Sequence, residues 1–256
     1  MKLNNWGFVQ IRVTAFFAAG ESFFPEPNSA FFLFTNKAPS NTQGKPIMGF
    51  YEQEGELNDA NLKIIIRKDR VDILVLPLIN EEDVLMSSNE IYLPNICKND
   101  EVEAKFINPI LSFFRDRPQV KIERLALGIK LRKEFDSVSS LYKYYSTLLP
   151  FKINPDTDSD VTLNINRPQT FENIKYNAII KMSAEKIIVD QSIDGNPDHL
   201  LQTFLLHQEY DINSIPSIEL NQELFKSKSI NYSDLLDEFF KFTQRKVDSP
   251  FCDFKE

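Results

Sequence analysis

The chain has 256 residues, of which 42% are hydrophobic, so it is long enough to bury a large core without disulfide or metal staples. Its formal net charge of −8 disfavours non-specific binding to phosphate backbones, and its 7 glycines, against 22 phenylalanines, argue against glycine-rich phosphate loops. A polar N-terminus, the absence of long apolar runs and two distant cysteines indicate a soluble, cytoplasmic protein that does not enter a membrane.

The N-terminal third reads mostly as strands. Apolar and polar residues alternate from Val9 to Phe16, which is typical of a half-buried strand. The apolar run Phe31–Phe34 lies between proline-containing segments and predicts a strand buried on both faces. A polar loop at 40–45 should follow, and after it three short strands at 47–51, Leu62–Ile66 and Val71–Leu76. The last two strands should form a hairpin around a charged turn.

Helical periodicity begins after residue 100. Residues 101–115 carry apolar side chains at helical spacing, with Pro109 inside, so either the helix is kinked there or a second helix starts with proline in its first turn. Residues 120–131 predict a strand, and alternation along it would place Arg124 and Lys130 on one face. A helix capped by Ser137 or Ser139 should follow and end at Pro150.

The C-terminal part again begins with strands. After the polar break 154–160, the strand-like segments are 161–166, 177–182, 186–189 and 200–210, with a turn signal at 194–197. An amphipathic helix from about Tyr232 to Lys246, capped by Asn231, closes the pattern.

Consecutive strands without crossover helices imply antiparallel pairing, so we expect an α+β fold. The prediction is one or more mostly antiparallel sheets with about three helices packed on one side. We expect a single compact domain spanning residues 1–256, with subdomains 1–150 and 151–256 as the alternative.

No nucleophile motif, cofactor motif or metal-ligand spacing emerges. His199 and His207 are the only histidines, and neither lies in a catalytic pattern. The acidic segment 156–160 begins like a calcium loop, but Val161 and Arg167 stand where that loop needs glycine and glutamate. We therefore expect no cofactor and no metal, and we lean towards a protein that is not an enzyme.

One enzymatic alternative stays open. Glu103 and Lys105 form a Glu-x-Lys pair, and Asp72 on an earlier strand could complete the metal-binding and water-activating set of a metal-dependent nuclease or hydrolase. The pair lies in a helical pattern, where residues two apart face different directions.

The surplus of phenylalanine is the least ordinary feature. The pairs Phe23-Phe24 and Phe31-Phe32 belong either to the protein's own core or to an apolar face that binds another protein. A third interpretation, a nucleic-acid or nucleotide sensor, requires that basic side chains share one concave face. The candidates for that face are Arg12, Arg67, Arg70, Arg124, Lys130 and Arg132.

Two stretches of the C-terminal part carry a resemblance. The first is the strand Val120–Leu127, with Arg124, Ala126 and Leu127, followed by a helix ending in Leu-Leu-Pro; the second is Glu209–Ile212, followed by the final helix. Together they resemble a sporadically distributed bacterial family of unknown function and similar length. The chain departs from that pattern at Gly128, where a second arginine is expected, and at His207 and Gln208, where an acidic residue is expected.

The resemblance implies a gene of the kind carried on mobile or defence islands, with no catalytic residues to transfer. Arg124 is the one position that it brings to this chain. The leading hypothesis is a non-enzymatic protein-binding component of antitoxin, immunity or antiviral-defence accessory type, whose partner is another protein such as a co-encoded effector. Its expected binding residues are Phe23, Phe24, Phe31, Phe32 and Arg124.

Overall fold

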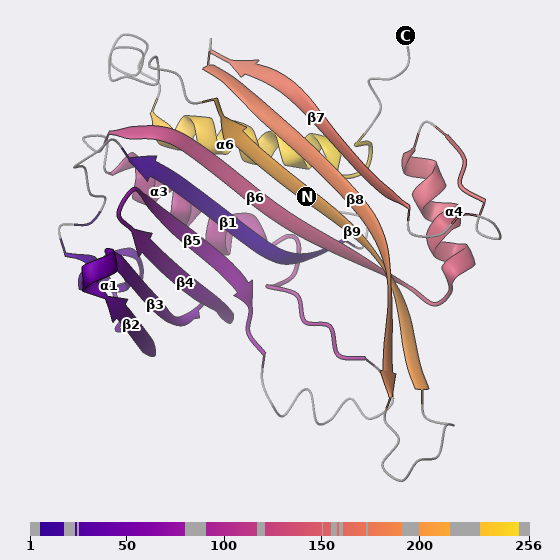
Figure 1. Ribbon diagram of the computed structural model, residues 1–256, viewed down its shortest axis with the longest axis horizontal. Helices are drawn as coiled ribbons and strands as arrows, with labels where there is room; N and C mark the ends of the chain where they lie inside the picture. Colours follow the sequence, from indigo (N-terminus) through magenta and orange to yellow (C-terminus); the bar gives the residue numbers. More distant parts are fainter. Residues whose placement is uncertain are drawn as a thin grey trace.

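The described residues build one antiparallel sheet (Figure 1). The computed structural model describes residues 6–17, 24, 26–79, 91–116, 121–149, 151–154, 158, 161–172, 174–190, 200–215 and 231–250. In these ranges nine strands pair in the order β2-β3-β4-β5-β1-β6-β9-β8-β7, and every pairing is antiparallel. The α+β class with antiparallel pairing is confirmed.

The strands are β1 (Gly7–Phe17), β2 (Asn41–Lys45), β3 (Phe50–Leu57), β4 (Ala60–Arg67), β5 (Arg70–Pro77), β6 (Ile122–Phe135), β7 (Thr162–Phe171), β8 (Ile174–Asp190) and β9 (Leu200–Ser214). The α-helices are α1 (Ala30–Thr35), α3 (Asn108–Arg115), α4 (Val138–Leu148) and α6 (Tyr232–Lys246). The described ranges thus hold four α-helices where about three were expected, and none is long and apolar enough to cross a membrane.

The two halves of the sheet follow the same path. Each begins with a central strand, β1 or β6, continues through a helix and a meander of outer strands, and returns beside its first strand before a closing helix. The two first strands pair with each other at the centre of the sheet. Along the chain, the first half therefore ends with α3 and the second half begins with β6. The subdomain boundary near residue 150 stays a prediction, since one sheet joins both parts.

The predicted strand at Phe31–Phe34 is wrong, because these residues form helix α1. The backbone N–H of Phe31 donates to the side chain of Gln53 on β3 at 2.9 Å, and Asn36 ends the helix in the left-handed conformation, with φ 56°. A helix sends Phe31 into the core and Phe32 outward, whereas a short apolar run alone does not distinguish a helix from a buried strand.

The predicted loop at 40–45 is also wrong, because residues 41–45 form the edge strand β2. All five side chains of β2 are exposed, so no apolar alternation marks it in the sequence, and its backbone pairs with β3 on one side. The predicted strand at 47–51 splits into a 3-10 turn, Pro46–Met48, and the start of β3.

The more periodic elements agree with expectation. The strand at 9–16, the hairpin around residues 67–70 and the strand at 120–131 appear as β1, β4–β5 and β6. Helix α6 runs from Tyr232 to Lys246 as predicted, and Asn231 and Asp234 cap it with reciprocal hydrogen bonds. The segments 177–182 and 186–189 belong to one long strand, β8. The predicted turn at 194–197 lies outside the described residues.

Pro109 does not interrupt the helical segment in which it lies. A π-helical turn, Glu103–Ile107, precedes α3, so the chain enters the helix with Pro109 in the first turn. Pro109 has no N–H for the carbonyl of Lys105, and the side chain of Asn58 donates to that carbonyl at 2.9 Å instead. Asn58 lies in the β3–β4 turn with φ 51°, a conformation that asparagine tolerates.

Replacing Asn58 by alanine is expected to lower the free energy of unfolding by about 1–2 kcal/mol, because the turn loses a residue suited to positive φ and the Lys105 carbonyl loses its donor. Urea denaturation measures the loss. Asn58→Gly keeps the turn conformation and removes only the hydrogen bond, so its loss should be smaller. Equal stability of wild type and both variants would contradict this role.

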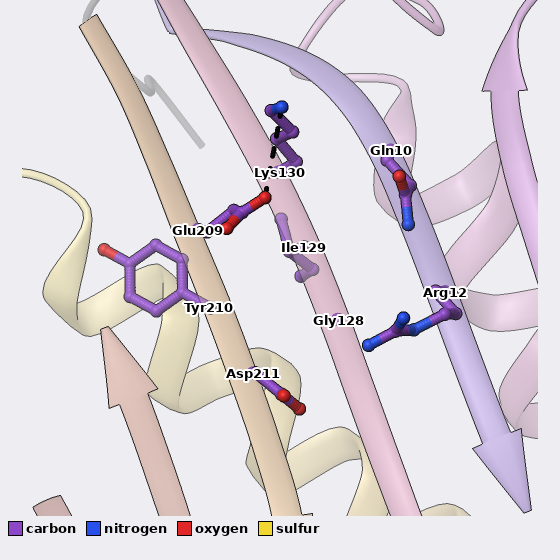
Figure 2. A pocket seen from close by; sticks show the side chains of 8 residues that line it. All are labelled: Gln10, Arg12, Gly128, Ile129, Lys130, Glu209, Tyr210 and Asp211. Atoms are coloured by element: carbon purple, nitrogen blue, oxygen red, sulfur yellow. Dashed lines mark ion pairs between the residues drawn. The ribbon is translucent and has the colours of Figure 1, made fainter. Parts of the chain in front are cut away.

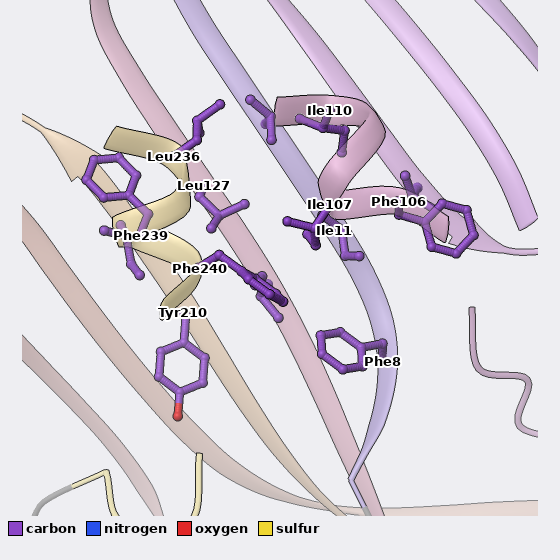
Figure 3. Packing of buried hydrophobic residues seen from close by; sticks show 14 of the residues in the cluster. Phe8, Ile11, Phe106, Ile107, Ile110, Leu127, Tyr210, Leu236, Phe239 and Phe240 are labelled. Carbon is purple, nitrogen blue, oxygen red and sulfur yellow. The ribbon is translucent and has the colours of Figure 1, made fainter. Parts of the chain in front are cut away.

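The core lies between the sheet and helices α3 and α6, which pass behind the strands in Figure 1. Side chains of both helices and of the π-helical turn meet the central strands over β1 and β6 (Figure 3). Buried members of this layer include Ile11, Ile107, Ile110, Leu127, Leu236, Phe239 and Phe240. The face turned away from α3 and α6 is free to carry polar side chains.

Candidate functional site

The face of the sheet turned away from α3 and α6 is polar, and we call it the polar face. On β1, Ile11 and Val13 enter the core, so Arg12 between them points to the opposite face. On β6, Leu127 and Ile129 enter the core in the same way. Because directly opposite residues of paired strands share a face, the register extends this polar surface across β4, β5, β1, β6, β9 and β8.

Five cations gather on adjacent strands of the polar face, and we call them the cationic strip: Arg12, Arg67, Arg70, Arg124 and Lys130. Arg70 is opposite Phe16 on β1, and Phe16 is in turn opposite Arg124 on β6. The sequence pattern had predicted that Arg124 and Lys130 share a face, and the register confirms it. A strip of this sign is notable in a chain whose formal charge is −8.

Asp72 is the carboxylate at one end of this strip. One of its oxygens accepts from the hydroxyl of Thr14 at 2.7 Å, and the other lies 2.5 Å from Arg67 and 3.2 Å from Arg70. The Asp72 side chain is 9% exposed, while both arginines remain more than one third exposed. Asp72 therefore serves as a shared counter-ion that holds two guanidinium groups in place.

The ring of Phe16 contacts two arginines of the cationic strip, Arg70 and Arg124. The guanidinium of Arg124 lies 5.1 Å from the centre of the Phe16 ring, and that of Arg70 lies 5.8 Å from it. Such cation–aromatic contacts orient guanidinium groups without neutralising their charge. Within the described residues Arg124 has no carboxylate partner, so its charge is available to a ligand.

A hollow of about 210 Å³ lies further along the same strands, with Gly128 as its floor (Figure 2). Arg12 from β1 and Asp211 from β9 point towards Gly128 from opposite sides. A Cβ atom on residue 128 would lie 3.3 Å from both Nε and Nη2 of Arg12. The guanidinium therefore occupies space that a glycine on β6 leaves free. The other residues around the hollow are Gln10, Ile129, Lys130, Glu209 and Tyr210.

The charges at this hollow are only partly paired. Glu209 lies 3.9 Å from Lys130 and 3.8 Å from Lys181, which are long ion-pair distances. Arg12 and Asp211 have no ion-pair partner in the part of the chain that the structure describes, and the buried Nε of Arg12 has no hydrogen-bond acceptor there. The hollow can thus offer both a donor group and an acceptor group to a ligand.

Two further residues border the polar face. Arg132 is turned into the protein, where its guanidinium donates to the backbone carbonyls of Leu93 and Pro94, so it anchors residues 91–95 and does not join the strip. The ring of His207 contacts Glu185 at 2.7 Å. Burial lowers the pKa of His207 below its ordinary value of 6.5, and the positive charge of Lys130 lowers it further, against the opposing effect of Glu185.

The lowered pKa of His207 makes stability depend on pH. The unfolded chain binds a proton at this residue more readily than the folded chain, so the stabilising contribution is complete above pH 6.5 and is lost as the pH falls through the folded pKa. The difference in unfolding free energy between wild type and His207→Gln should therefore change on acidification below pH 6.5, as measured by urea denaturation at several pH values. A difference independent of pH would contradict the assignment.

The alternative nuclease set is not brought together. The ammonium of Lys105 lies 3.4 Å from Asp59 and 3.0 Å from Glu101. Asp59 directly precedes the first residue of β4, so Lys105 lies near the start of that strand. Asp72 is opposite Ile65, roughly 20 Å further along β4, on the polar face. Glu103 shares the helical turn of Lys105, so it is equally remote. No group of three potential metal ligands occurs among the described residues.

Two of the four phenylalanines that were expected to bind a partner are buried in the core. Phe24 and Phe31 are 1% and 0% exposed, so their expected binding role is corrected to a core role, with Phe24 packing on Phe113 of α3. Phe32 is 54% exposed on α1. Phe23 lies outside the described residues. Of the expected binding residues in the described part, Arg124 is the one that belongs to the polar face.

Comparison with known proteins leaves the site to be judged on its own geometry. No protein-family model matches the chain, and no curated protein matches its sequence. Gly128 and Asp211, which line the hollow, are not among the candidate residues predicted from the sequence. A glycine at an outward position of a strand is a signal for close approach of another group, and it could have marked the hollow in advance.

Proposed function

We propose that the chain is a non-enzymatic binding protein and that an acidic surface of a partner protein docks on the cationic strip. The observation that carries this proposal is the gathering of Arg12, Arg67, Arg70, Arg124 and Lys130 on one face, with Asp72 as the carboxylate bound among them. Complementary charge steers a partner to such a face and fixes its orientation.

The proposal assigns different tasks to the two faces of the sheet. In this proposal the helices pack on one side of the sheet and cover the core. The polar face on the other side is left for the partner. Three contacts support this: the Phe31 N–H with Gln53, the Tyr145 hydroxyl with the Met182 carbonyl, and the ring of Phe239 against Tyr176. Each joins a helix to a residue of β3 or β8 on the side of the buried core.

The specific form of the proposal is an antitoxin, immunity or antiviral-defence accessory that binds a co-encoded effector. It rests on the resemblance to the sporadically distributed bacterial family and on the position of Arg124 within the cationic strip. Arginine suits this task because its planar guanidinium binds carboxylates through two parallel hydrogen bonds.

A single-stranded nucleic acid is the second candidate. It is favoured by the guanidinium groups of Arg12 and Arg124, which have no carboxylate partner among the described residues and could equally bind phosphate. The formal charge of −8 opposes it, because the rest of the surface repels a polyanion longer than the strip.

Fluorescence anisotropy tests the proposal with the full chain and two labelled probes, an oligo-glutamate peptide and an oligothymidine of equal charge. The site variant is Arg12→Glu with Arg124→Glu, and Arg12→Gln with Arg124→Gln repeats the test without charge reversal. The matched control is Lys143→Glu with Lys241→Glu, which makes the same change of charge on the exposed surfaces of α4 and α6.

We expect the wild type to bind oligo-glutamate in a salt-dependent manner, and both site variants to lose that binding while the control retains it. Thermal midpoints verify that each variant is folded. Equal binding by the site variants and the control would overturn the proposal. Tighter, strip-dependent binding of oligothymidine would replace it with the nucleic-acid candidate.

A further inference from the structure

Gly128 has no conformational reason to be glycine. It lies inside the central strand β6 and does not adopt a positive φ, and glycine in a strand interior weakens the strand. What glycine provides here is space. A Cβ would lie 3.3 Å from two nitrogen atoms of Arg12, so alanine would push the guanidinium out of its present position.

The groups on either side of Gly128 are complementary to each other yet remain apart. Arg12 and Asp211 extend from the two strands that flank β6, and both point towards the glycine (Figure 2). They do not form an ion pair, and the Arg12 Nε is buried without an acceptor among the described residues. A buried donor without a partner is costly, and a ligand between the two side chains would satisfy it.

The four charged residues around the hollow are arranged with the cations on one side and the anions on the other. The cations Arg12 and Lys130 come from β1 and β6, while the anions Glu209 and Asp211 come from β9. A ligand with a single charge would meet attraction on one side and repulsion on the other. A ligand with an anionic and a cationic group would meet attraction on both sides.

The geometry points to a binding site for a small zwitterion of the α-amino-acid class in this hollow. Its carboxylate is bound by Arg12, with Lys130 adding positive charge, and its ammonium group is bound by Asp211, with Glu209 adding negative charge. The hollow of about 210 Å³ has the size for a single such molecule or for the zwitterionic end group of a larger one. The inference rests on the proposed function, in that it makes the polar face a binding face, and it adds a second ligand to that face.

Isothermal titration calorimetry on the full chain tests the inference with a panel of α-amino acids, each compared with the amine that lacks its carboxylate and the acid that lacks its ammonium group. The site variants are Arg12→Gln, Asp211→Asn and Gly128→Ala. Glu185→Gln is the matched control, because it changes a charge of the polar face on β8 outside the hollow.

We expect at least one amino acid to bind about tenfold more tightly than either of its analogues, since each charge-assisted hydrogen bond contributes that much or more. Arg12→Gln and Asp211→Asn should each weaken binding by a similar factor. Gly128→Ala should remove binding while its thermal midpoint is unchanged or raised, because alanine suits a strand better than glycine does.

Two results would overturn the inference: no heat of binding with any amino acid of the panel, or binding that Gly128→Ala leaves intact. Neither would affect the proposed function if oligo-glutamate still bound to the cationic strip, because Arg70 and Arg124 lie outside the hollow. Conversely, binding of an amino acid without binding of oligo-glutamate would retain the site and reject the acidic partner.

Discussion

Replacing Phe31 by alanine should lower the free energy of unfolding by about 3–5 kcal/mol, whereas Phe32→Ala should change it by about 0.5 kcal/mol or less. Phe31 is fully buried against Gly55 of β3, where a Cβ on the glycine would lie 2.7 Å from the tip of its ring. Truncation would leave a cavity between α1 and the sheet. Phe32, one position along the same helix, is 54% exposed.

The comparison decides between two interpretations of this phenylalanine pair. If both rings formed a binding face, the two alanine variants would have similar stability and both would lose partner binding. The fold instead predicts a large difference in the midpoint of urea denaturation. A loss of less than about 1 kcal/mol for Phe31→Ala would show that the ring is not in the core.

Replacing Asp72 by alanine should cost about 2–3 kcal/mol, because Arg67 and Arg70 would lose their shared counter-ion and the Thr14 hydroxyl would lose its acceptor. This value is below that for a fully buried ion pair, since the two arginines are more than one third exposed and water screens part of their repulsion. Urea denaturation measures the loss.

Asp72→Asn separates the two contributions. The amide oxygen still accepts from Thr14, but the negative charge between the arginines is gone, so the loss of stability should be intermediate and should shrink at high salt. If Asp72 were instead a metal ligand, chelation of divalent ions would destabilise the wild type and leave Asp72→Ala unaffected. The positions of Arg67 and Arg70 predict that a chelator has no effect.

Elements with strong periodicity could be predicted from the sequence, and elements defined by their neighbours could not. The alternation in β1 and the capped amphipathic helix α6 contain their own signals. Strand β2 has none, because all of its side chains face solvent and only backbone pairing with β3 defines it. Helix α1 depends on Gln53, which is distant in the sequence and satisfies the N–H of Phe31.

The cationic strip was partly predictable. Alternation along residues 120–131 is enough to place Arg124 and Lys130 on one face. That Arg70 lies opposite Phe16, and Phe16 opposite Arg124, requires the strand order β5-β1-β6, which brings together segments more than fifty residues apart. The hollow at Gly128 depends on the same order, because Arg12 and Asp211 flank the glycine only when β1 and β9 lie on either side of β6.

Lysine acetylation in the presence of the oligo-glutamate probe tests most directly whether the polar face is the binding face. Lys130 and Lys181 lie on that face, at the hollow and beside it, while Lys143 and Lys241 lie on α4 and α6. Mass spectrometry should show that the bound probe slows acetylation of Lys130 and Lys181 and leaves Lys143 and Lys241 unchanged. Protection of Lys143 and Lys241, with Lys130 and Lys181 reacting as in the free protein, would contradict the account.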